Sequence, residues 1–181
     1  MNRIPLIDRN ATSPDRKALL DTINGAFGMT PNMFRAVANS PAALKSMWGS
    51  FGALGAGVIP AKLGEQIAVA VANRNGCEYC LAAHTALGRS AGASATELRD
   101  AQAGVSADAR TQAALHFALK LVDKRGQIEA ADVQALRTAG FGDAEIVEIL
   151  AHVALSLFTN YVNVALAVPV DFPGVKLREA A

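Results

Sequence analysis

A chain of 181 residues can bury one substantial hydrophobic core, and its formal net charge of +1 excludes the strongly basic surface that nucleic-acid-binding proteins carry. Charged residues make up only 18% of the chain and hydrophobic residues 51%, which is a low charge content for a soluble domain that remains alone. The composition predicts either an unusually large core or a small subunit that covers apolar surface by self-association, and we favour self-association.

The sequence predicts neither an export signal nor a membrane-spanning helix. Residues 1–10 contain no apolar run of the secretory type. The most apolar stretch, residues 146–168, contains His152, Asn160 and Asn163, so we interpret it as a buried helix rather than a membrane span. We therefore expect a cytoplasmic protein without membrane contact, where a cysteine pair is more often redox-active or metal-binding than structural.

Proline pairs mark the helix starts of the first third of the chain. Ser13, Thr30 and Ser40 each precede a proline, so each is expected to cap a helix that begins with that proline. The predicted helices of this part are 14–26, 31–39 and 41–54. Aromatic side chains recur along them and are expected to form the core of an N-terminal arm, and the alternative is that some of them roof a thiol pocket: Phe27, Phe34, Trp48 and Phe51.

The remaining two thirds show helical spacing of apolar residues and no strand alternation. Pro60, the pair Ser94 and Glu97, and the pair Ser106 and Asp108 mark further helix starts. The predicted helices here are 60–74, 78–90, 95–103, 107–124, 129–138 and 143–167. We therefore predict one all-α domain over residues 1–181, with an N-terminal helical arm (1–55) and a core (60–167).

The two cysteines of the chain are separated by two residues and followed by a histidine. Cys77, Cys80 and His84 form the motif C-x-x-C-x-x-x-H directly after a break at Asn75-Gly76. The break predicts an antiparallel helix hairpin with the C-x-x-C pair at the N-terminus of its second helix. The positive end of that helix dipole and a nearby histidine both favour a reactive thiolate.

Glu65 lies on the first helix of this hairpin, about as far from the break as His84. At a rise of about 1.5 Å per residue, both lie roughly 14–15 Å from the turn on facing helices, so we expect them to meet. His84 also follows Cys80 by one turn on the same helix face. The spacing predicts that Glu65 orients His84 and that His84 takes the proton of Cys80.

Such a set can carry a dithiol–disulfide cycle. A peroxide would oxidise Cys80 to a sulfenic acid, Cys77 would close the disulfide, and an external dithiol would reduce it. Two buried structural cysteines or a zinc site are alternatives, and zinc would need a fourth ligand beyond Cys77, Cys80 and His84. We expect His116 and His152 to be core or interface histidines, and Asn160 and Asn163 to form hydrogen bonds within packed helices.

The segment from Glu65 to His84 resembles the alkylhydroperoxidase D-like group of the carboxymuconolactone decarboxylase family. Residues 64–92 are similar to the core of that domain. The tail, Phe158 to Asn163 followed by Asp171-Phe172-Pro173, is similar to its peroxidase-related branch. The resemblance implies an all-helical fold that assembles as trimers or hexamers and a peroxidase that uses no metal or other cofactor.

Carried over by position, the resemblance implies that Cys80 is the peroxidatic cysteine and Cys77 the resolving one. It implies that His84 is the base and that Glu65 starts the proton relay. The best-known members carry a second histidine directly before the second cysteine, where this chain has Tyr79. Decarboxylase relatives lack the cysteine pair, so its presence here favours redox chemistry.

We therefore predict a homo-oligomeric peroxidase of antioxidant defence that acts on a small-molecule hydroperoxide and is restored by an external dithiol, for example of lipoyl type. Two enzymatic alternatives are a thiol–disulfide oxidoreductase and a carboxymuconolactone decarboxylase-like enzyme. A non-enzymatic alternative is a zinc-stabilised or oligomerising interaction module.

Overall fold

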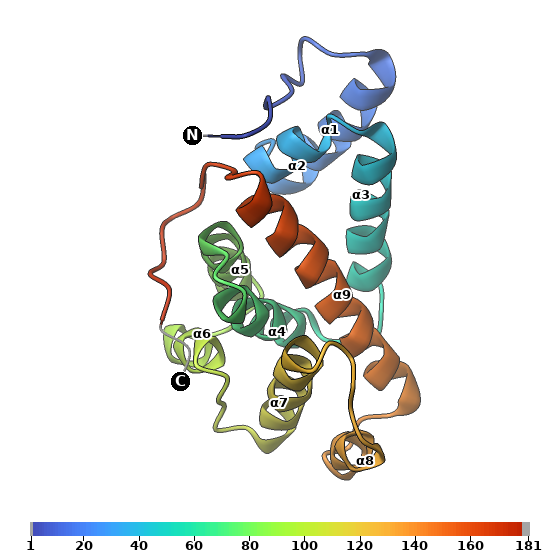
Figure 1. The fold of residues 1–181 in the computed structure, drawn as a ribbon, viewed down its shortest axis with the longest axis vertical. Helices are drawn as coiled ribbons and strands as arrows, with labels where there is room; N and C mark the ends of the chain where they lie inside the picture. The colour runs from blue at the N-terminus through green and yellow to red at the C-terminus, as the bar shows by residue number, and fades with distance from the viewer. Residues whose placement is uncertain (1, 179–181) are drawn as a thin grey trace.

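The computed structural model describes residues 2–178, and all regular structure in this part of the chain is helical (Figure 1). The prediction of an all-α chain is confirmed, and each predicted helix is present with ends within two residues of the expected ones. The helices are α1 (Pro14–Phe27), α2 (Asn32–Val37), α3 (Pro41–Gly55), α4 (Ala61–Arg74), α5 (Glu78–Ser90), α6 (Ala95–Gln102), α7 (Ala109–Asp123), α8 (Ala130–Thr138) and α9 (Asp143–Ala165).

The local signals that start the helices act largely as predicted. The Ser40 side chain accepts a hydrogen bond from the first turn of α3, and Ser94 forms a reciprocal capping box with Glu97. The prediction for Thr30 is wrong, because α2 begins one residue later, after Pro31, and the Thr30 hydroxyl lies 3.1 Å from the side-chain oxygen of Asn24. Capping chemistry therefore sets the helix boundaries to within a residue or two.

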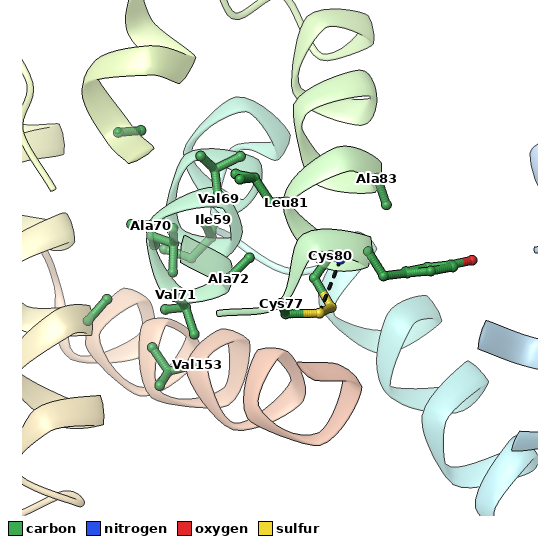
Figure 2. Packing of buried hydrophobic residues seen from close by; sticks show 14 of the residues in the cluster. Ile59, Val69, Ala70, Val71, Ala72, Cys77, Cys80, Leu81, Ala83 and Val153 are labelled. Atoms are coloured by element: carbon green, nitrogen blue, oxygen red, sulfur yellow. Dashed lines mark hydrogen bonds between the residues drawn. A yellow bond between two sulfur atoms is a disulfide. The ribbon is translucent and has the colours of Figure 1, made fainter. Parts of the chain in front are cut away.

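Helix α4 is the central helix of the core. It packs against α5, α6, α7 and α9, and Ile67, Val69 and Val71 on it are 0% exposed. Figure 2 shows Val71 and Ala72 of α4 between the cysteine-bearing end of α5 and Val153 of α9. Because α4 is held from several sides, the residues that it carries toward α5 have fixed positions.

The N-terminal arm folds back onto α9. Helices α2 and α3 both contact α9, and α1 contacts α3 (Figure 1). Phe34 is at the centre of the aromatic cluster, with ring centroids of Phe27, Trp48 and Phe51 all within 5.8 Å of its own. The predicted aromatic core of the arm is therefore present, and it lies against the same helix as the cysteine-bearing helix α5.

Among residues 2–178, α9 is the helix that is long and apolar enough, by length and composition alone, to cross a membrane. It also packs against α2, α3, α4, α5, α7 and α8. Only 33% of its most apolar stretch is buried, so one face lies in the core while the other remains uncovered in the single chain.

Candidate active site

The turn between α4 and α5 places the cysteines at a helix N-terminus. Gly76 adopts a φ of 65°, a left-handed conformation that glycine reaches without strain, and reverses the chain after Asn75. Cys77 then takes the N-cap position of α5, and Cys80 lies in its first turn. The predicted hairpin with the motif at its second helix is confirmed.

Cys77 and Cys80 are joined as a disulfide, with their Cα atoms 5.3 Å apart (Figure 2). The Sγ atom of Cys77 also accepts the backbone N–H of Cys80 at 3.2 Å. Both residues are nearly covered, at 1% and 2% exposure. The helix N-terminus therefore offers a positive electrostatic environment to either sulfur when the pair is reduced.

Glu65 and His84 form the contact that the hairpin register predicted. The Nδ1 atom of His84 lies 2.8 Å from Oε2 of Glu65, and both side chains are largely covered. A carboxylate that accepts a hydrogen bond from Nδ1 favours the imidazole tautomer with its proton on Nδ1. The Nε2 atom is then free to take part in proton transfer. No hydrogen bond joins His84 to Cys80 in residues 2–178, although both border one small cavity.

Asn163 of α9 is the direct side-chain partner of Cys80, and sequence reasoning did not assign it to the site. Its Nδ2 donates to Cys80 Sγ at 3.2 Å, across a sequence separation of 83 residues. Asn163 is 3% exposed, so the contact is shielded from water. An amide N–H in this position would stabilise a Cys80 thiolate. Asn160, one turn earlier, instead accepts a hydrogen bond from Asn75 at 2.8 Å.

Two cavities meet at His84 and share Phe51 and Thr159 as further lining residues. The smaller, of about 30 Å³, is bordered by Cys80 and roofed by aromatic side chains of the arm, among them Phe34. The larger, of about 210 Å³, lies between α3, α4 and α9 and has Glu65 on its wall. His84 therefore stands between the cysteine and a space that is large enough for a small organic molecule.

His152 borders the larger cavity, a position that its apolar surroundings in the sequence did not predict. Its Nε2 atom is buried without a hydrogen-bond partner among residues 2–178. Burial lowers the pKa of His152, and the carboxylates of Glu148 and Glu65 oppose part of this shift. Gly64 leaves the necessary room, since a Cβ atom there would lie 3.1 Å from Cε1 of His152. The cavity therefore has a second, neutral imidazole on its wall.

The other expectations for single residues have mixed outcomes. His116 is exposed on α7, so it is not a core histidine. Tyr79, which lies between the cysteines, is 4% exposed, and its hydroxyl accepts the backbone N–H of Met33 at 3.2 Å. Burial raises the pKa of Tyr79 far above its usual value. Its ring also meets Phe172 edge to face, so Tyr79 joins the arm and the C-terminal tail to the motif helix.

The described part of the chain, residues 2–178, contains no group of three His, Cys, Asp or Glu side chains placed to hold a metal ion. Glu65 is paired with His84, and the two cysteines are bonded to each other. The geometry around the motif is thus a bonded cysteine pair near a histidine that is hydrogen-bonded to a carboxylate.

Residues 41–124 match the carboxymuconolactone decarboxylase family model. An uncharacterised peroxidase-related protein from Ralstonia eutropha JMP134, an alkylhydroperoxidase AhpD core, has a similar structure with a TM-score of 0.85 and 25% sequence identity, over 94% of this chain and 92% of that one. The family match and this structural similarity support placing the chain in the alkylhydroperoxidase D-like branch of that family. A peroxidase-related protein from Silicibacter sp. TM1040 is similar over 98% of this chain and 93% of its own, with 26% identity and a TM-score of 0.79.

The fold of this family also occurs in an enzyme with a different activity. The debrominase Bmp8 in its apo form has a TM-score of 0.78 to this chain at 21% identity, over 93% of this chain and 91% of its own. At 21% identity, this similarity shows a shared fold and does not extend to the activity. The comparison with curated proteins gives no match.

Proposed function

We propose that this family member is a thiol-dependent peroxidase that reduces organic hydroperoxides through a Cys77–Cys80 dithiol–disulfide cycle. The observation that carries the proposal is that His84, which lines the cavity that Cys80 borders, is paired with Glu65 at 2.8 Å. This arrangement supports the proposal, because a side chain that can transfer protons and a cysteine sulfur border one space, and a helix N-terminus favours the thiolate.

In the first step, His84 accepts the proton of the Cys80 thiol and the thiolate attacks one oxygen of the hydroperoxide. The oxygen–oxygen bond breaks, the sulfur becomes a sulfenic acid, and the other oxygen leaves with the proton from His84 as an alcohol. Glu65 holds the imidazole in the required tautomer and stabilises the imidazolium that forms in between. Asn163 stabilises the thiolate before the attack.

In the second step, the Cys77 thiol attacks the sulfenic sulfur of Cys80, and water leaves as the disulfide forms. An external dithiol then reduces the disulfide by thiol–disulfide exchange and is itself oxidised to a disulfide. A dithiol of lipoyl type in a reducing compartment such as the cytoplasm fits this need. The cycle uses no metal or bound cofactor.

The walls of the larger cavity favour an organic peroxide over hydrogen peroxide. Phe51, Leu54, Ile59 and Leu155 supply apolar surface beside His84, and the volume of about 210 Å³ exceeds what a two-oxygen molecule fills. An alkyl or aryl group placed there would be taken out of water while its peroxide group points toward Cys80. Turnover with cumene hydroperoxide should therefore exceed turnover with hydrogen peroxide.

The test uses reduced protein, one equivalent of cumene hydroperoxide and intact mass spectrometry. We expect the wild-type protein to lose two hydrogen atoms and both free thiols. We expect Cys77→Ser to stop at a sulfenic acid on Cys80, which a sulfenic-acid reagent labels, and Cys80→Ser to remain unoxidised.

Each alternative gives a different result. If Cys80→Ser reacts and Cys77→Ser does not, the roles of the cysteines are reversed. If both thiols survive while the protein reduces a disulfide substrate, the enzyme is a thiol–disulfide oxidoreductase. If both survive and a lactone substrate is decarboxylated, the peroxidase proposal fails.

A further inference from the structure

The outward face of α9 carries an unbroken apolar stripe. Val147, Leu150, Tyr161 and Val164 are 63%, 39%, 64% and 49% exposed, and Phe158 beside them is 37% exposed. Ala154, in the middle of the stripe, is also exposed, and Leu157 is partly covered. A face of this kind is unusual on a helix whose opposite side already lies in the core.

The stripe has the spacing of a helix–helix seam. Its members alternate three and four residues apart, which is the heptad pattern with apolar residues at the first and fourth positions: Val147, Leu150, Ala154, Leu157, Tyr161 and Val164. This repeat matches the surface of a second helix laid along the first, with side chains of each entering gaps of the other. No helix among residues 2–178 covers it.

The stripe is complementary to itself when two copies run in opposite directions. Ala154 lies midway between Val147 and Tyr161, and also midway between Leu150 and Phe158. Two antiparallel copies that cross at Ala154 would place the small residue at the closest approach and each large side chain opposite a smaller one. A two-fold axis through the crossing point satisfies both copies at once.

Charge favours the same orientation. The acidic residues of α9 are all at its beginning, Asp143, Glu145 and Glu148, and residues 149–165 contain no charged side chain. A parallel pair would bring the acidic ends of two copies together, whereas an antiparallel pair separates them and opposes the two helix dipoles.

The size of the stripe meets the requirement of a weak to moderate dimer. The exposed fractions of its large side chains correspond to an apolar patch on the order of 500 Å², about the most that a monomer exposes. Two such patches face to face would bury about 1,000 Å², which is the lower bound for a specific interface. The low charged fraction of the chain, 18%, agrees with a surface that is covered in the assembly.

We propose that a second copy of this chain docks on the outward face of α9, with the two α9 helices antiparallel and crossing at Ala154. The interface goes beyond the catalytic proposal and does not depend on it. Any larger assembly of this protein would then contain this two-fold contact.

The test measures molar mass by analytical ultracentrifugation for Val147→Lys, for Tyr161→Glu and for the double variant. In the proposed dimer, position 147 of one copy meets position 161 of the other, while the two positions within one helix are about 21 Å apart. We expect the wild-type protein to be an even-numbered oligomer. Each single variant should have half the molar mass at the same concentration, and the double variant should regain it through lysine–glutamate pairs across the interface.

Val105→Lys is the matched control, because Val105 is 49% exposed and lies outside the stripe. It should leave the molar mass unchanged, and circular dichroism should show the same helix content in all variants. A monomeric wild-type protein, an assembly that both single variants leave intact, or a double variant that stays dissociated would overturn the proposal. Wild-type binding to phosphatidylcholine vesicles as a monomer would assign the face to a membrane surface instead.

Discussion

Replacing Asn163 by leucine removes the one side-chain donor on Cys80 Sγ among residues 2–178 and keeps a similar volume. Asn163 and Cys80 are 3% and 2% exposed, so water cannot replace the lost hydrogen bond. A hydrogen bond to a charged acceptor contributes about 1.5–3 kcal/mol, which lowers the thiolate fraction at neutral pH by about 10- to 150-fold. A less stabilised thiolate is also more nucleophilic, with a Brønsted coefficient of about 0.5, so the rate constant should fall by only about 3- to 12-fold.

The assay is single-turnover oxidation of the reduced protein by cumene hydroperoxide across a pH series. For Asn163→Leu we expect the rise of rate with pH to move to higher pH and the final plateau to exceed that of the wild-type protein. The control is Asn160→Leu, which is equally buried on the same helix and bonds Asn75 instead of a sulfur. An Asn163→Leu profile that coincides with the control would refute the argument that the amide stabilises the thiolate.

Further predictions concern the base, the core and pH. Glu65→Gln should slow peroxide consumption about 10-fold at neutral pH, because His84 loses a charge-assisted hydrogen bond; an undiminished rate would remove Glu65 from the relay. Ile67→Ala should lower the free energy of unfolding in urea by about 2–5 kcal/mol, since Ile67 is 0% exposed on the central helix; a loss below about 1 kcal/mol would contradict the packing. Burial lowers the pKa of His152 below its ordinary value of 6.5, so the unfolded chain binds the proton more readily and stability falls as pH drops below about 6.5. In the same pH window His152→Gln should lose less stability than the wild-type protein, and equal losses would show that His152 is not buried neutral.

The helices and the central pair of the site could be predicted because both depend on local signals. Ser40 and Ser94 fix helix starts within one turn of themselves. The Glu65–His84 contact involves two helices joined by one tight turn at Gly76. The contact is therefore predictable from the number of residues that separate each side chain from the turn. Thr30 shows the limit of such signals, because a competing side chain six residues earlier redirected its hydroxyl.

The parts of the site that come from α9 could not be placed from the sequence. Asn163 reaches Cys80 only because α9 packs across the α4–α5 hairpin, and no local pattern specifies that packing. A signal was nevertheless present. Ser156, Asn160 and Asn163 repeat at helical spacing on one side of an apolar helix, and all are buried. Polar residues that share the buried side of a helix need partners, and here one of these partners is the Cys80 sulfur.

The segment that matches the family, residues 41–124, contains both cysteines, Glu65 and His84. It lacks Asn163, His152 and most of the aromatic roof, which come from α9 and from the first two helices. We therefore propose that the whole of residues 1–181 works as one unit. The reactive atoms belong to one short hairpin, while the surfaces that choose a substrate belong to segments on either side of it. Evolution can then exchange the substrate by changing the flanking segments and leave the chemistry of the hairpin untouched.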